Sequence, residues 1–62
     1  MIKMNRREIM ETLEELSQVN GLYGRVLRSI KELNSEDFEI LMHELESRNF
    51  KCPVDLIMYI ES

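Results

Sequence analysis

The sequence predicts an all-α fold, a compact bundle of three to four short helices that forms a single domain over residues 1–62. Apolar residues recur at spacings of three and four along most of the chain, which is the period of an α-helix with one buried face. The breaks between these stretches are short, as in helical bundles. Helices are expected at about 5–20, 22–34, 35–48 and 53–61.

The first helix is predicted from its cap and its apolar stripe. Asn5 can accept a hydrogen bond from the backbone of Glu8, and the Glu8 side chain can reciprocate, as in a capping box. Asn20 and Gly21 predict the end of the helix, because glycine tolerates the left-handed conformation that often follows a helix. Thr12 is expected to face water beside the neighbouring glutamates. The expected apolar stripe consists of Ile9, Met10, Leu13, Leu16 and Val19.

The second helix carries an apolar stripe and a basic face. Its interior glycine, Gly24, costs about 1 kcal/mol relative to alanine, so it indicates either a close helix crossing or local flexibility. Arg25, Arg28 and Lys31 lie together on a different face from the stripe. The stripe consists of Tyr23, Val26, Leu27, Ile30 and Leu33.

The third and fourth helices are separated by a proline. The third is expected to start at Asn34–Ser35 and to end at Asn49, a residue that tolerates the left-handed C-terminal cap. Pro53 suits the first position of a helix. Val54–Ile60 is apolar almost all round, which predicts a short buried helix; its alternating residues also fit a strand, which would need a partner from a second chain. The third stripe consists of Phe38, Leu41, Met42 and Leu45.

The composition indicates a binding protein and not an enzyme. Cys52 and His43 are the only cysteine and histidine, so the chain has no disulfide and too few ligands for a structural zinc site. No cofactor motif is present. We expect His43 to be solvated and Cys52 to be a half-buried structural thiol. A lone thiol and the absence of a secretory or membrane-spanning stretch indicate a cytoplasmic setting.

The distribution of charge favours a protein partner. The net charge is −4, and the acidic excess lies in residues 35–62, which carry seven acidic and two basic side chains. Methionine, tyrosine and arginine are common at protein interfaces. The candidate partner-binding residues are Tyr23, Arg25, Arg28 and Lys31. Val54–Ile60 is a second candidate surface, through which two copies of the chain would form a homodimer.

A small helix-turn-helix DNA-binding protein is the alternative function. The first helix, the turn at Asn20–Gly21 and the 22–33 helix can be laid on that motif, which places Arg25 and Arg28 early on the recognition helix. An ordinary helical hairpin needs the same residues, and the acidic remainder of the chain disfavours binding to phosphate. Nucleic acid is therefore the less favoured partner.

Two stretches resemble short uncharacterised proteins of phages and mobile elements of low-GC Gram-positive bacteria. They are Gly21-Leu22-Tyr23-Gly24-Arg25-Val26-Leu27 and the segment from Glu44 to Tyr59, which contains Asn49-Phe50-Lys51-Cys52-Pro53-Val54-Asp55-Leu56-Ile57-Met58. Cys52 departs from the pattern, because an acidic residue is expected there. The resemblance implies no particular activity; it implies a phage- or prophage-encoded accessory protein that binds and modulates a host protein.

Overall fold

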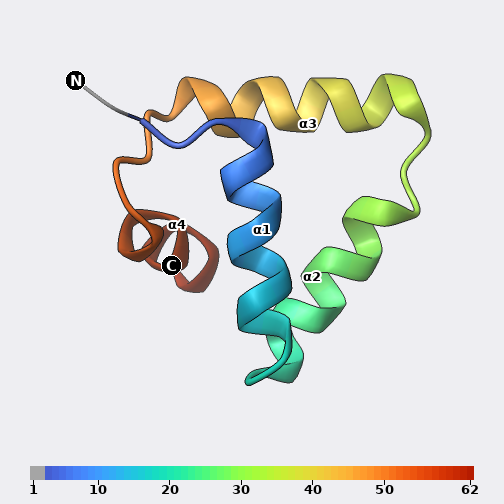
Figure 1. Ribbon diagram of the computed structural model, residues 1–62. Helices are drawn as coiled ribbons and strands as arrows, with labels where there is room; N and C mark the ends of the chain where they lie inside the picture. The colour runs from blue at the N-terminus through green and yellow to red at the C-terminus, as the bar shows by residue number, and fades with distance from the viewer. Residues whose placement is uncertain (1–2) are drawn as a thin grey trace.

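The computed structural model describes residues 3–62, and this part of the chain is helical with no strand (Figure 1). The helices are α1 (Arg6–Ser17), α2 (Gly21–Lys31), α3 (Ser35–Ser47) and α4 (Pro53–Glu61). The predicted all-α fold is therefore confirmed. The first two helices end at residues 17 and 31, three residues before their predicted ends, whereas the bounds of the other two agree within one residue.

α1 is the central element of the fold. It runs through the middle of the molecule, α2 turns back beside it, α3 crosses at one end, and α4 lies on the side away from α2 (Figure 1). α1 contacts all three other helices and packs most extensively against α2. The other helices thus share α1 as a common support.

The core consists of apolar side chains from every helix. The fully enclosed side chains include Ile9 and Leu13 of α1, Met42 of α3 and Leu56 of α4. The start of the chain joins this core because the backbone N–H of Met4 donates a hydrogen bond to the carbonyl oxygen of Phe50 over 2.7 Å. The core side chains are Met4, Ile9, Leu13, Tyr23, Leu27, Ile30, Met42, Leu45, Phe50 and Leu56.

Asparagines start three of the helices. Asn5 and Glu8 form the predicted capping box, with both reciprocal hydrogen bonds present. Asn34 accepts a hydrogen bond from the third backbone N–H of α3. Asn20 likewise caps the start of α2, so the prediction that Asn20 and Gly21 provide a left-handed stop for the first helix is wrong. Gly21 is the first residue of α2 and has a negative φ.

Two predictions about exposure on α1 are also wrong. Val19 is 82% exposed because the helix ends before it, so it cannot continue the apolar stripe. Thr12, expected to face water, is only 9% exposed. It lines a hollow together with residues of the segment that leads into α4.

The last fifteen residues follow the predicted local structure closely. Asn49 has φ 59°, the left-handed conformation expected after α3, and Pro53 is the first residue of α4. Val54–Ile60 is helical, so the strand interpretation is wrong. The helix is buried on one side only, because Leu56 is fully enclosed while Val54 and Met58 are 57% and 65% exposed.

Candidate functional site

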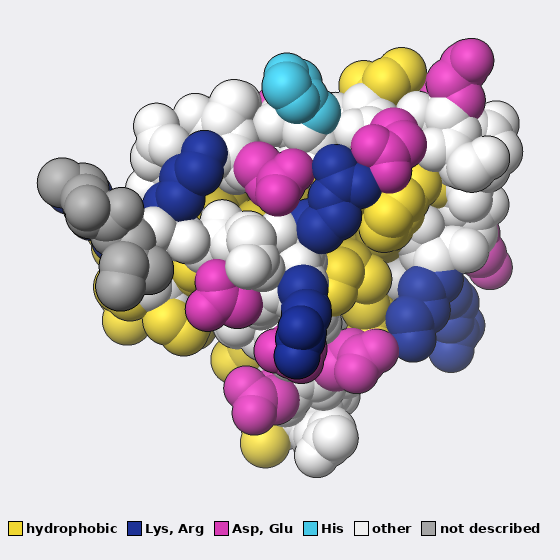
Figure 2. Space-filling view, turned by 45° about the horizontal axis from the view of Figure 1, so that its top comes forward, with side chains coloured by type: hydrophobic (Ala, Val, Ile, Leu, Met, Phe, Trp, Pro, Cys, Tyr) yellow, Lys and Arg dark blue, Asp and Glu magenta, His cyan; other side chains and the backbone are white. Residues whose placement is uncertain are grey.

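The predicted basic residues lie on the exposed face of α2. Arg25, Arg28 and Lys31 are all exposed. Figure 2 shows basic side chains spread over the face of the molecule, with one group at its right edge. Lys31 makes an ion pair of 3.4 Å with Glu14 of α1. Arg25 and Arg28 make no ion pair within residues 3–62, so their guanidinium groups are available to an acidic or phosphate-bearing partner.

Tyr23 does not belong to this exposed face. It is 2% exposed, and its hydroxyl donates a 2.5 Å hydrogen bond to Oε2 of Glu61. This hydrogen bond to a carboxylate, together with burial, raises the pKa of Tyr23 to about 12. The prediction that Tyr23 lies on an exposed patch with Arg25 and Arg28 is therefore wrong. Its role is structural: it ties the beginning of α2 to the end of α4.

A small apolar groove opens where the four helices meet. Its volume is about 140 Å³, and Leu13 and Leu56 form its buried floor. Val26, Leu41 and Ile60 are half-buried and form part of its walls. The other lining residues are Ile30, Leu45 and Tyr59. A concave surface with almost no polar atoms is suited to an apolar side chain, and a hydroxyl or a charge would lose its hydration there.

The Tyr59 wall of this groove is held in place from outside. The guanidinium carbon of Arg48 lies 4.3 Å from the centre of the Tyr59 ring, a cation–π contact. On the same ring, Phe50 packs in a tilted arrangement with the ring centres 5.6 Å apart. Tyr59 is therefore held by contacts on its ring from both Arg48 and Phe50.

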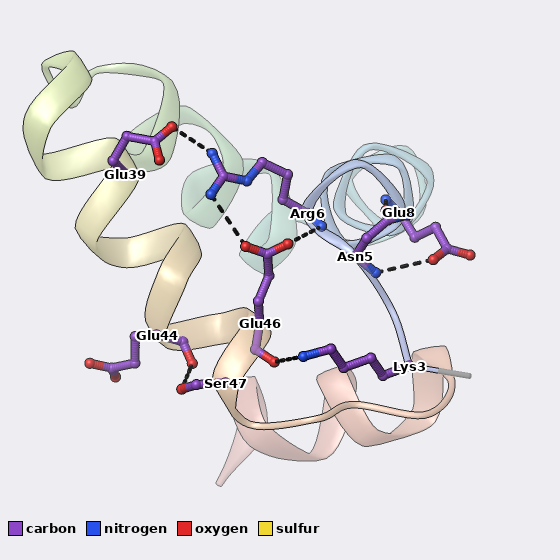
Figure 3. Close-up of polar contacts among 8 residues, drawn as sticks. All are labelled: Lys3, Asn5, Arg6, Glu8, Glu39, Glu44, Glu46 and Ser47. Carbon is purple, nitrogen blue, oxygen red and sulfur yellow. Dashed lines mark hydrogen bonds and ion pairs between the residues drawn. The ribbon is translucent and has the colours of Figure 1, made fainter. Parts of the chain in front are cut away.

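A polar network fixes α3, another wall of the groove, against α1 (Figure 3). The Arg6 guanidinium forms ion pairs with Glu39 at 2.5 Å and Glu46 at 3.2 Å. The backbone N–H of Arg6 also donates a hydrogen bond to the Glu46 carboxylate. The Lys3 ammonium donates a hydrogen bond to the carbonyl oxygen of Glu46. Hydrogen bonding to Arg6 lowers the pKa of Glu39. Glu46 is thus a half-buried link between the two helices.

His43 and Cys52 lie on the surface and apart from the groove lining. His43, the cyan residue of Figure 2, is an exposed side chain of α3, as expected. Cys52 is exposed at the N-cap of α4, so the prediction of a half-buried thiol is wrong. Residues 3–62 contain no group of three or more His, Cys, Asp or Glu side chains arranged to hold a metal ion. Within the same range, no helix is long and apolar enough to cross a membrane.

Leu56, Tyr59 and Ile60 of the groove lie in Val54–Ile60, the second candidate surface predicted from the sequence, whereas the other five lining residues do not belong to any predicted binding site. Leu41 and Val26 were assigned to apolar stripes, and the sequence pattern does not distinguish a stripe residue that is fully covered from one at the margin of the core. The available indication in the sequence is that Val54–Ile60 is apolar almost all round. A comparison of the chain with protein families, curated proteins and solved structures finds no match.

Proposed function

We propose that this chain is a small, non-enzymatic, cytoplasmic module, phage- or prophage-encoded, that binds and modulates a protein. The observation that carries the proposal is the apolar groove, to which all four helices contribute. A groove of this size accepts one or two side chains of a partner segment. Arg25 and Arg28 lie on the exposed face of α2, the helix that also supplies Val26 and Ile30 to the groove.

Several features of the groove support a protein as the occupant. Helices and extended segments of proteins present single apolar side chains to grooves of this kind, and main-chain and rim contacts add affinity. The exposed arginines of α2 would pair with acidic side chains beside the inserted residue. The phage resemblance agrees with this function, because an accessory protein without a catalytic site acts through binding.

Two neighbouring residues of α3 provide a matched test. Leu41 lines the groove, whereas Ile40 is exposed and lies outside the lining. Leu41→Lys would place a charged side chain in the groove, and Ile40→Lys makes the same type of change outside it. Tagged wild-type chain and both variants, expressed at native level, would be used to capture proteins from host lysate.

We expect the same partner to be recovered by the wild type and by Ile40→Lys, and to be lost with Leu41→Lys. Far-UV circular dichroism of each variant would confirm that the helices are retained. Recovery of no partner by the wild type, or equal recovery by both variants, would contradict the proposal.

A second copy of the chain is the other protein occupant to test. Val54 and Met58 lie one turn apart on α4 and are both more than half exposed, as expected of a helix face that pairs with its own copy. Sedimentation equilibrium would reveal a dimer, and Met58→Lys should dissociate it. A monomer over the full concentration range would exclude the homodimer through Val54–Ile60.

DNA binding remains the second candidate function, favoured by the unpaired state of Arg25 and Arg28 within residues 3–62. The net charge of −4 weighs against it. Fluorescence anisotropy with a labelled duplex would show strongly salt-dependent binding. The double variant Arg25→Ala, Arg28→Ala should then reduce the salt slope by about 2. The absence of binding at low salt would remove this candidate.

A further inference from the structure

The apolar groove has room for about one aromatic ring. Its volume of about 140 Å³ is close to that of an apolar cavity of roughly 150 Å³ that binds benzene in another protein. The half-buried walls formed by Val26, Leu41 and Ile60 reach the surface of the molecule, so a ring can enter while it stays attached to a polypeptide. A leucine side chain would fill less of this volume.

The walls of the groove favour a ring without polar atoms. Seven of its eight lining residues are aliphatic, and the eighth is Tyr59. The hydroxyl of a tyrosine or the N–H of a tryptophan would lose its hydration among these side chains without gaining a hydrogen-bond partner. Tyr59 adds an aromatic contact, because paired rings attract each other beyond the area that they bury. Phenylalanine therefore matches the groove better than tyrosine, tryptophan or leucine.

Of the two exposed arginines of α2, Arg25 is the nearer to the groove. Neither Arg25 nor Arg28 makes an ion pair within residues 3–62. Arg25 lies about 100° around the helix from Val26, a wall of the groove, whereas Arg28 lies about 160° from it. The side of α2 next to Arg28 faces α1, where Lys31 pairs with Glu14. Arg25 can therefore reach a residue that flanks an occupant of the groove, and Arg28 lies on the far side of the helix.

Arg48 supplies a second cation, beside the Tyr59 wall. Its guanidinium carbon lies 4.3 Å from the centre of the Tyr59 ring. Its ion pair with Glu44, at 3.6 Å, joins two side chains that are 45% and 56% exposed, so Arg48 can exchange this partner for another carboxylate. Cations thus stand beside two walls of the groove, which complements negative charge on both sides of an inserted residue.

We propose that the occupant of the apolar groove is a phenylalanine side chain of a partner protein, with acidic residues on both sides of it in the partner sequence. The ring fills the groove, and the flanking carboxylates pair with Arg25 on the α2 side and with Arg48 on the Tyr59 side. This inference rests on the proposed function, because it names the chemistry of the segment that the groove binds.

The probe is a peptide that has one phenylalanine between two pairs of glutamates and blocked ends. Titration into ¹⁵N-labelled full-length chain should shift the amide resonances of Val26, Leu41 and Ile60, and the shifts supply the dissociation constant. A peptide with leucine in place of phenylalanine should bind about fivefold more weakly, and one with tyrosine roughly tenfold more weakly. A peptide with phenylalanine between lysines should also bind roughly tenfold more weakly, because its charges repel Arg25 and Arg48.

Two arginine variants of α2 form a matched pair. Arg25→Gln should weaken binding of the phenylalanine peptide about threefold, as expected for the loss of one surface ion pair. Arg28→Gln, with the same change of net charge, should leave the dissociation constant within about 1.5-fold of the wild-type value. Arg48→Gln should have an effect of about the same size as Arg25→Gln. Leu41→Lys should abolish binding, and far-UV circular dichroism would confirm that its helices are retained.

Three results would overturn the inference. A tyrosine peptide that binds as tightly as the phenylalanine peptide would mean that the ring does not enter the apolar lining. Equal losses in Arg25→Gln and Arg28→Gln would mean that the peptide responds only to overall charge. Toluene binding as tightly as the peptide, with the same amide shifts, would assign the groove to small apolar molecules and not to a protein segment.

The peptide experiment and the capture of a partner from lysate fail independently. If capture from lysate depends on Leu41 and the phenylalanine peptide does not bind, the proposed function stands and the assignment of phenylalanine is wrong. If the peptide binds as predicted and the lysate yields no partner, the chemistry of the groove stands and the proposed function is wrong.

Discussion

Replacement of Leu56 by alanine tests whether α4 is part of the folded core. Leu56 is 0% exposed, and the change removes three carbons from this site. At about 0.8 kcal/mol for each buried carbon, the lost burial amounts to about 2.4 kcal/mol. The cavity left behind adds to this, so the free energy of unfolding should fall by about 3 kcal/mol.

The loss is large for a domain of this length. At roughly 0.05–0.15 kcal/mol per residue, a chain of 62 residues has a free energy of unfolding of about 3–9 kcal/mol. Urea unfolding followed by far-UV circular dichroism would measure the change. If Leu56→Ala is already unfolded in buffer, Leu56→Val, which removes one buried carbon, should lower the free energy of unfolding by about 0.8 kcal/mol.

Val54 provides the control on the same helix. It is 57% exposed, so Val54→Ala should change the free energy of unfolding by no more than about 0.5 kcal/mol. A loss below about 1 kcal/mol for Leu56→Ala, or equal losses for Leu56→Ala and Val54→Ala, would refute the packing of α4 and with it one wall of the apolar groove.

Three further predictions follow from particular contacts. Gly24→Ala should stabilise the chain by about 0.5–1 kcal/mol, because the added carbon would meet only the Cβ of Ser17 in α1, at an ordinary contact distance of 3.9 Å. Destabilisation in urea would contradict this. Tyr59→Phe leaves Tyr23 as the one tyrosine of the chain, so absorbance near 295 nm would follow its ionisation, with an expected midpoint at about 12. Adding Glu61→Gln to this variant should lower the midpoint. Since the pKa of tyrosine in an unfolded chain is about 10, the contribution of this hydrogen bond to stability should be intact below pH 10 and should be lost as pH rises from about 10 to 12. A Tyr23 titration midpoint near 10 would exclude the hydrogen bond. Because the pKa of Glu39 is lower in the folded chain than in the unfolded chain, its pairing with Arg6 stabilises the fold only above the unfolded pKa. The wild type should therefore lose more thermal stability than Glu39→Gln as pH falls from about 5 to 3. Identical pH profiles of the two proteins would contradict the pairing.

The sequence was most informative where structure depends on neighbouring residues. The capping box of Asn5 and Glu8, the left-handed turn at Asn49 and the helix start at Pro53 each involve groups within a few positions, so residue types alone predicted them. Asn20 shows the limit of this reasoning. Asparagine can end one helix or begin the next, and the choice depends on backbone conformation that the sequence does not express.

Features that depend on distant residues were not predicted. The stripe placed Tyr23 in the core, but its hydroxyl bonds to Glu61, 38 positions away. Arg6 and Glu46 are 40 positions apart and hold α1 against α3. Thr12 lies among solvated glutamates in the sequence and is nevertheless buried in the fold. The apolar groove arises from such long-range packing, so its full lining required the structure.

The central claim is that the apolar groove holds a segment of a partner protein, and site-specific photo-crosslinking tests it most directly. A benzophenone-bearing phenylalanine would be placed at Leu41, inside the groove, and in a second variant at the neighbouring Ile40. Both variants would be irradiated in lysate at native expression level. The account predicts an adduct with one protein from position 41 and little or none from position 40. Equal adducts at the two positions, or no adduct from position 41, would contradict it.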